Sequence, residues 1–193
     1  AQNYAYKSQW GLGFGGSYVR VTGAELVGAE GAIGGYLSLQ RDFSEATGIR
    51  IKGFYRQVKS TNVFPKPETT VLGADVDLIY RFIPCEPVVP YLALGIGLAN
   101  YDIKNAMNFA DESGLDYSIN FGIGMNIRLS HRWDIVSELS YHNTANDKID
   151  GFKQSGPVPS GGILGGYSDS YMTFNVGFKY NFGLGEQSKV CDL

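Results

Sequence analysis

Residues 117–128 read YSINFGIGMNIR, and every second residue in this stretch is bulky and apolar. The positions between them carry only Ser, Asn, Gly and Arg. A period of two places successive side chains on opposite faces of a sheet, which is typical of a β-strand. The stretch therefore predicts a strand with one apolar face and one polar face.

The same alternation recurs along the whole chain. It is found near residues 11–18, 33–40, 49–56, 72–82, 92–98, 133–142 and 173–182. Short connections, at about 41–47, 83–89 and 129–132, alternate with long polar ones, at about 22–30, 58–69, 102–115 and 143–169. This order predicts an all-β fold, an eight-stranded antiparallel up-and-down barrel, because closure removes the exposed sheet edges.

The polar positions of these segments carry both signs of charge in nearly equal number. They are Arg50, Lys52, Arg56, Asp75, Asp77, Arg81, Asp116, Arg128, Asp134, Glu138 and Lys179. An eight-stranded barrel is just wide enough inside for side chains, and the aromatic-rich apolar set is too bulky for that space. We therefore expect the charged set to form a salt-bridge network in the lumen, because an unpaired buried charge is costly. The apolar set then faces lipid.

Aromatic residues gather near both ends of the predicted strands. Those near the short connections are Trp10, Tyr80, Phe82, Trp133, Tyr180 and Phe182, and those near the long ones are Tyr18, Tyr55, Tyr117 and Tyr141. Two aromatic girdles around an aliphatic band mark the interfaces of a membrane. Tyr91, Tyr101 and Tyr171 are exceptions, since they fall at lumen-facing positions.

Composition excludes several classes of site. The net charge is −3 and no Lys/Arg cluster occurs, which argues against nucleic-acid binding. Two Cys and two isolated His predict no metal centre. The glycine repeats at 11–15 and 95–97 are followed by no helix, so they do not predict a nucleotide cofactor.

One segment suggests a hydrolase as an alternative. His142-Asn143-Thr144, followed by Asp147 and Asp150, resembles the His-x-Ser motif of outer-membrane lipid A deacylases. However, the nucleophile would be Thr, and His142 falls at a lumen-facing position at the barrel rim, whereas a lipid hydrolase must face lipid. We therefore predict no catalytic residues and no enzymatic activity.

Three further stretches carry a resemblance to a known family. Residues 90–97 (PYLALGIG), 129–134 (LSHRWD) and 178–182 (FKYNF) resemble the OmpA-like N-terminal membrane domain, and the likeness extends over about 9–183. The resemblance implies an outer-membrane barrel whose last strand is read by the insertion machinery. Residues 146–151 (NDKIDG) resemble barrels of the Bacteroidota type, some of which are subunits of envelope machines.

The expected organisation is a lead-in at 1–8, the barrel at 9–183 and a tail at 184–193. The first residues, Ala1-Gln2-Asn3, fit the mature end left by signal-peptidase cleavage. In outer-membrane barrels the short turns are periplasmic and the long loops extracellular. We therefore expect both termini to lie in the periplasm of a bacterial cell.

The two cysteines are expected to meet. Cys85 lies in a short turn and Cys191 in the tail, so the topology places both at the periplasmic end. The periplasm is oxidising, and the nine residues from Phe182 to Cys191 reach roughly 30 Å when extended, enough to cross a barrel mouth. The sequence predicts a Cys85–Cys191 disulfide that folds the tail under the barrel.

These observations favour an envelope anchor or docking subunit for a partner protein complex. The partner would bind the tail or the long loops, among which Ile163 and Leu164 in 143–169 are the apolar residues expected to make contact. The barrel would also contact outer-membrane lipid and lipopolysaccharide. A small-solute channel or uptake barrel is the main alternative, and a lipid A acyl hydrolase is the third.

Overall fold

The computed structural model describes residues 6–21, 32–59, 68–104, 112–144, 170–186 and 191 of the 193-residue chain. Within these ranges, eight long strands account for nearly all regular structure. The same ranges contain no helix long and apolar enough to cross a membrane.

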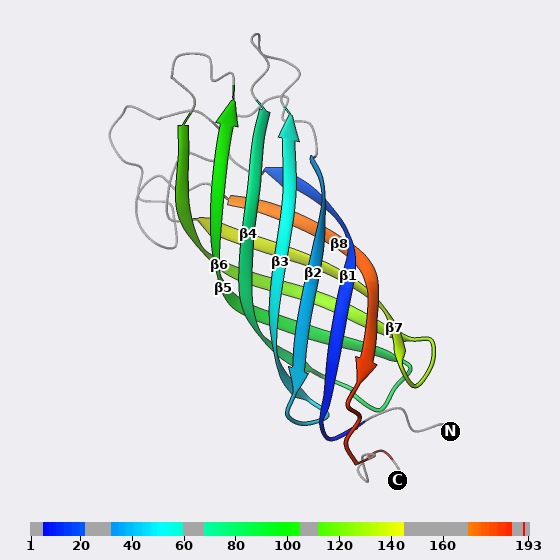
Figure 1. The fold of residues 1–193 in the computed structure, drawn as a ribbon. Coiled ribbons are helices and arrows are strands. Elements are labelled where there is room, and N and C mark those ends of the chain that lie inside the picture. Colours follow the sequence, from blue (N-terminus) through cyan, green and yellow to red (C-terminus); the bar gives the residue numbers. More distant parts are fainter. Residues whose placement is uncertain are drawn as a thin grey trace.

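The eight strands form one closed barrel in which each strand pairs with its neighbours in the sequence (Figure 1). They are β1 (Gln9–Val21), β2 (Ala32–Asp42), β3 (Thr47–Lys59), β4 (Glu68–Arg81), β5 (Val88–Lys104), β6 (Glu112–Arg128), β7 (Trp133–Thr144) and β8 (Ser170–Phe182). Antiparallel pairing of β1 with β8, from Trp10 opposite Phe182 to Val21 opposite Tyr171, closes the barrel. The predicted fold is confirmed.

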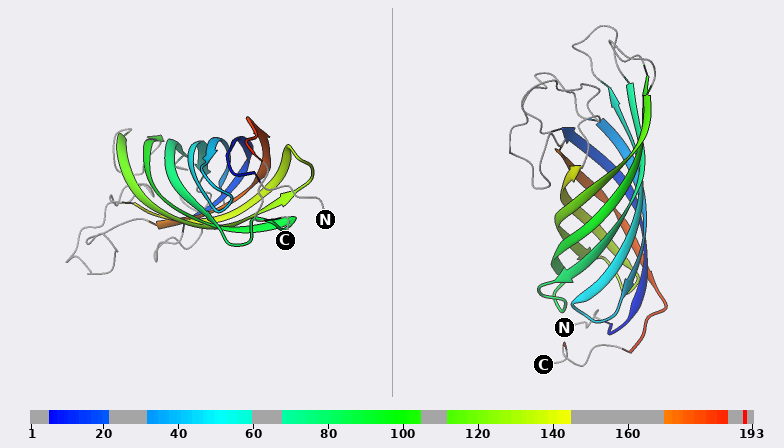
Figure 2. Two further views of the ribbon diagram at one scale, coloured as in Figure 1. Left: turned by 90° about the horizontal axis from the view of Figure 1, so that it is seen from below. Right: turned by 90° about the vertical axis from the view of Figure 1, so that its left-hand side faces the viewer.

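The two ends of the barrel differ. Residues 43–46, 82–87 and 129–132 form short turns at one end, which we call the turn end. The first and last described segments of the chain lie at the same end (Figures 1 and 2). The opposite end, which we call the loop end, is where β1, β3, β5 and β7 finish.

Several strands are longer than the alternation predicted. The connection expected at 102–115 is only 105–111, because β5 continues to Lys104 and β6 begins at Glu112. Near this end polar residues such as the exposed Asp102 replace the apolar ones. Backbone pairing continues where the apolar pattern has already ended, so the pattern underestimates strand length.

Burial separates the two faces of the wall sharply. Outward residues such as Ile96 and Leu37 are 68% and 66% exposed, whereas inward Asp75 is 0% exposed. The buried set is dominated by charged and amide side chains, and the exposed set by aliphatic and aromatic ones. The barrel is thus polar inside and apolar outside, the reverse of a water-soluble barrel.

Inward-facing glycines make room for the charged side chains. A Cβ atom added at Gly95 would collide with the carboxylate of Asp77, and one added at Gly97 would collide with that of Asp75. Both glycines lie directly opposite these aspartates in the β4–β5 register. The Gly95–Gly97 repeat therefore serves the packing of the lumen.

Candidate functional site: the barrel interior and its turn end

An ion-pair network crosses the middle of the lumen. Arg50 on β3 donates through Nε and Nη2 to Asp77 Oδ2 on β4, at 2.9 and 2.7 Å. Its Nη1 lies 2.6 Å from Glu138 Oε2 on β7. Since β3 and β7 are not neighbours in the sheet, the Arg50 side chain bridges opposite walls.

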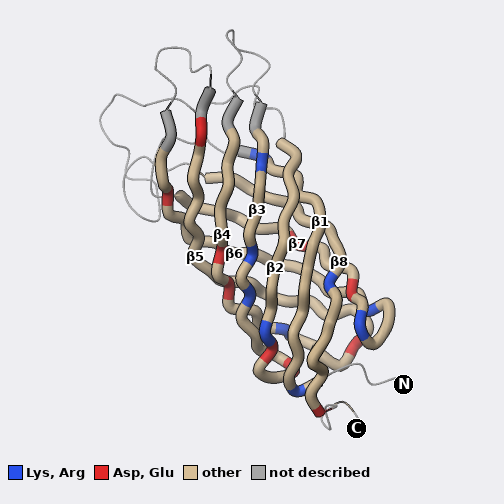
Figure 3. Tube along the Cα trace, viewed as in Figure 1, with Lys and Arg blue, Asp and Glu red and all other residues tan. Residues whose placement is uncertain are grey.

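Glu138 is the centre of this network. Besides Arg50, it accepts hydrogen bonds from Lys52 Nζ at 3.2 Å, Tyr91 Oη at 2.7 Å and Ser140 Oγ at 2.9 Å. Lys52 Nζ also lies 3.4 Å from Asp75 Oδ2. Figure 3 shows positive and negative positions close together along the middle of the barrel. At this level the lumen is filled by paired, hydrogen-bonded side chains.

A second charge cluster lies nearer the turn end. Arg81 Nη2 donates to Asp42 Oδ1 at 2.6 Å, and Asp42 also accepts from the amides of Gln9 at 2.9 Å and Gln40 at 2.7 Å. Asp42 is 2% exposed. The Arg81–Asp42 ion pair joins the end of β4 to the end of β2. A carboxylate this deeply buried would be costly without a cationic partner.

The remaining pairs fasten other strand ends. Lys179 Nζ on β8 lies 3.1 Å from Asp134 Oδ2 on β7, which also accepts from Asn181 Nδ2 at 3.0 Å. Arg128 Nη2 donates to the carbonyl of Pro84 at 3.0 Å. This last contact ties the end of β6 to the 82–87 turn.

Toward the loop end, stacked side chains reach across the lumen. The guanidinium carbon of Arg56 lies 3.8 Å from the centre of the Phe54 ring and 5.2 Å from that of Tyr171. Tyr171 stacks on His142 with ring centres 4.6 Å apart, and His142 Nδ1 lies 2.9 Å from Asn120 Oδ1. Arg56 has no hydrogen-bond partner among the described residues, so aromatic rings take the place of a carboxylate.

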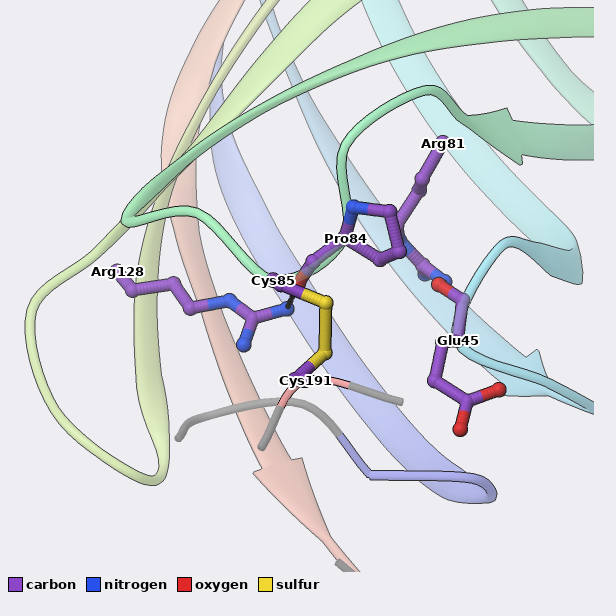
Figure 4. The surroundings of a disulfide bond; sticks show 6 residues. All are labelled: Glu45, Arg81, Pro84, Cys85, Arg128 and Cys191. Carbon is purple, nitrogen blue, oxygen red and sulfur yellow. Dashed lines mark hydrogen bonds between the residues drawn. A yellow bond between two sulfur atoms is a disulfide. The ribbon is translucent and has the colours of Figure 1, made fainter. Parts of the chain in front are cut away.

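A disulfide closes the turn end. Cys85, in the 82–87 turn, is bonded to Cys191, and their Cα atoms lie 5.3 Å apart (Figure 4). Next to this bond, Arg81 Nη1 donates to the carbonyl of Glu45 at 3.3 Å, which joins the end of β4 to the 43–46 turn. The predicted disulfide is confirmed.

The segments before β1 and after β8 also pair with each other. The Lys7 amide donates to the Glu186 carbonyl at 3.0 Å, and the Gly185 amide donates to the Ser8 carbonyl at 2.7 Å. Gly183 adopts a φ of 56°, which lets the chain turn sharply after β8. Both flanking segments are therefore held at the turn end.

A comparison with protein families gives the class of this barrel. The model of the outer membrane protein beta-barrel domain matches residues 1–182. The chain belongs to this family. Its barrel is accordingly one of the bacterial outer membrane, and the exposed apolar face is the surface that contacts lipid.

Solved structures of outer-membrane barrels share the fold. OprG from Pseudomonas aeruginosa is 13% identical with a TM-score of 0.60, over 94% of this chain and 99% of OprG. Ail of Yersinia pestis, solved with the heparin analogue sucrose octasulfate, is 17% identical with a TM-score of 0.54, over 91% and 97%. Neisserial surface protein A is 12% identical with a TM-score of 0.57, over 92% and 99%. A comparison with curated protein sequences finds no match.

The structure places the predicted lumen charges of this outer-membrane barrel on its inner wall. It brings together Arg50, Lys52, Asp75, Asp77 and Glu138 in one network, and pairs Lys179 with Asp134. The other four residues of the predicted set make different contacts. Arg81 pairs with Asp42, Arg56 stacks on rings, Arg128 binds a backbone carbonyl, and Asp116 accepts the Tyr117 amide at 2.8 Å.

Asp42 is the important residue that sequence reasoning missed. The alternation predicted from the sequence covers residues 33–40, so Asp42 falls in the predicted connection at 41–47. In the structure β2 extends to Asp42. Asp42 follows the inward-facing Gln40 by two residues, so its side chain also faces the lumen, where it accepts a hydrogen bond from Gln40. Continuing the period of two by one step would have assigned Asp42 to the lumen.

His142 lies two residues before the end of β7, near the loop end, and its side chain faces the lumen as predicted. His142 is 0% exposed, because its ring is enclosed by Tyr171 and Asn120 inside the wall. Thr144 is 2% exposed, so neither side chain of the suggested hydrolase motif is open to a substrate from the bilayer.

Some predicted site residues lie in the connection between β7 and β8. Ile163 and Leu164, the predicted partner contacts, and Asp147 and Asp150 lie outside the described residues. Within the part of the chain that the structure describes, no group of three His, Cys, Asp or Glu side chains could hold a metal ion.

Proposed function

We propose that this protein is a non-enzymatic outer-membrane anchor that holds a partner protein at its turn end. The observation that carries the proposal is the Cys85–Cys191 disulfide, which bonds the tail to a turn at the end where the first strand begins. The backbone pairing of Lys7 with Glu186 adds a second attachment. A tail fixed in this way offers a partner a preformed surface, which lowers the entropic cost of binding.

The barrel interior supports an anchoring role over a transport role. The Arg50–Glu138 ion pair bridges the lumen at its middle, and Tyr91 and Lys52 fill the space beside it. Removing Glu138 would take away the buried carboxylate that Arg50 and Lys52 share. If the lumen is filled, a protein partner has the two ends of the barrel as its accessible binding surfaces.

The proposed orientation places the turn end in the periplasm. Both the 1–8 lead-in and the 184–193 tail would then be periplasmic, and the long connections would be extracellular. The disulfide fits this orientation, since disulfides form and persist in the bacterial periplasm. The connection at 145–169, with Ile163 and Leu164, would offer a second contact surface outside the cell.

Site-specific photo-crosslinking in living cells tests the proposal. A photoreactive amino acid at the exposed Glu186 should yield a covalent adduct with one partner protein. The same residue at the lipid-facing Leu94, which is 47% exposed, serves as the control and should yield no such adduct. The Cys191→Ser variant should weaken the Glu186 adduct, because the tail is then released. Absence of any protein adduct at Glu186 would contradict the proposal.

A further inference from the structure

The lipid-facing wall carries an apolar groove of about 600 Å³ across β1 to β4. Its sides are the exposed side chains of Phe14, Leu37, Tyr55 and Leu72. The groove is open along its length, so an occupant would keep one side against the surrounding lipid. Its exposed sides are outward side chains, so the groove opens toward the bilayer, and the buried Tyr36 and Phe54 also border it.

The groove exists because glycine replaces bulky residues at outward positions. Gly53 pairs with Leu37 on one side and with Ala74 on the other, and Gly16 pairs with Gly35. A Cβ atom added at Gly53 would find no heavy atom nearer than 4.0 Å. Unlike the crowded inward glycines, these outward ones are not required by packing against the protein itself.

Depth decides the chemistry of the occupant. Leu37 and Gly53 are the middle residues of β2 and β3, so the groove begins at mid-height of the barrel. The hydrocarbon core of a bilayer lies at this level, and a polar group placed there would be desolvated. The occupant is therefore a hydrocarbon.

Shape argues against a second copy of the chain. A two-fold symmetric interface needs a patch that is complementary to itself, and two concave grooves facing each other would leave a void. A flexible acyl chain can follow a concave apolar surface and gain dispersion contacts along it. The groove is also continuous with the face that lipid already covers.

We infer that this groove binds an acyl chain of lipopolysaccharide. From its mid-height origin the groove extends toward the loop end, because Tyr55 and Leu72 lie in the halves of β3 and β4 nearest that end. In the proposed orientation that half of the wall lies in the outer leaflet, which is formed by lipopolysaccharide. The assignment to this lipid rests on the proposed orientation, whereas the groove itself does not.

Native mass spectrometry in mild detergent tests the inference, with purified lipid A and phosphatidylethanolamine as separate probes. The wild-type barrel should retain one lipid A, and no more phospholipid than lipid A. Gly53→Leu and Gly35→Leu, which fill the groove, should weaken retention by at least about tenfold, because each Leu displaces several methylene groups. Ser137→Leu, at an outward position on β7, is the matched control and should retain lipid A as the wild type does.

Several outcomes would overturn the inference. These are no retained lipid in the wild type, equal retention in the filled variants, preference for the phospholipid, or an adduct with the mass of a second chain. Heat-dependent gel mobility shows whether each variant is folded, and the open space at Gly53 favours folding. Labelling of Asp102→Cys with a membrane-impermeant reagent on intact cells tests the orientation separately. Labelling is expected if the loop end is extracellular, and its absence would contradict the proposed orientation without bearing on lipid binding by the groove.

Discussion

Arg50 and Glu138 belong to strands that are not neighbours in the sheet, yet Arg50 Nη1 lies 2.6 Å from Glu138 Oε2 inside the barrel. The two side chains are only 6% and 2% exposed. This contact joins opposite walls of the barrel across the lumen. In the proposed anchoring role, the same residues would both stabilise the barrel and close its lumen.

Replacing Glu138 with Ala should lower the free energy of unfolding by about 3–5 kcal/mol, because Arg50 and Lys52 lose their shared buried partner. Ile123→Ala, on the lipid-facing side of β6, should cost less since lipid fills the space. Urea-induced unfolding in lipid vesicles measures both variants. A larger loss for Ile123→Ala would mean that the inner and outer faces have been assigned the wrong way round.

Arginine at lipid-facing positions should show a dependence on depth. Ile123 lies well inside β6 and Leu115 near its loop end, and both side chains are about half exposed. Ile123→Arg should cost about 2–4 kcal/mol, as at a bilayer midplane, and Leu115→Arg about 0–1 kcal/mol. Vesicle unfolding titrations compare them, and equal costs at the two depths would argue against a membrane-spanning wall.

Inward and outward glycines should respond differently to the same substitution. Gly95→Ala should destabilise the barrel by about 1–3 kcal/mol, because the added methyl group collides with the Asp77 carboxylate and the Val76 carbonyl. Gly53→Ala should be close to neutral, since its Cβ meets open space. Thermal unfolding of both variants in one detergent provides the comparison. Strong destabilisation by Gly53→Ala would be inconsistent with an open outer groove.

Loss of the disulfide should release the tail without unfolding the barrel. Chain-entropy estimates give an upper limit of about 4–5 kcal/mol for a crosslink over this separation, but the barrel already orders most of the enclosed chain. Cys191→Ser should therefore lower stability by less than this limit. Limited proteolysis should cut the variant after Glu186 faster than the wild type. Two alkylatable thiols in the unreduced wild type would rule out the bond.

The sequence was sufficient for the barrel and for the choice of faces. Alternation around Ile119, Phe121 and Ile123 places their neighbours on the other face, and the structure has this arrangement. The disulfide followed from topology, because an even number of strands returns the tail to the end where Cys85 lies. Both inferences depend only on periodicity and strand count.

Contacts across the lumen could not be predicted in the same way. Strand tilt and the stagger of the register decide which residues on β3 and β7 face each other. Neither quantity can be predicted from the local sequence pattern. Arg56 shows a second difficulty, since its partners Phe54 and Tyr171 are aromatic and gave no electrostatic signal. The complete burial of His142 between Tyr171 and Asn120 is a further contact that no local pattern predicts.

The central claim is that paired charges close the lumen, so that the barrel anchors and does not conduct. Single-channel recording of the folded wild-type protein in planar lipid bilayers tests this claim most directly. The Arg50–Glu138 pair and the Tyr91 hydroxyl beside it predict a flat current with no discrete steps at moderate voltage. Reproducible single-channel openings by the folded barrel would contradict the account and favour a small-solute channel.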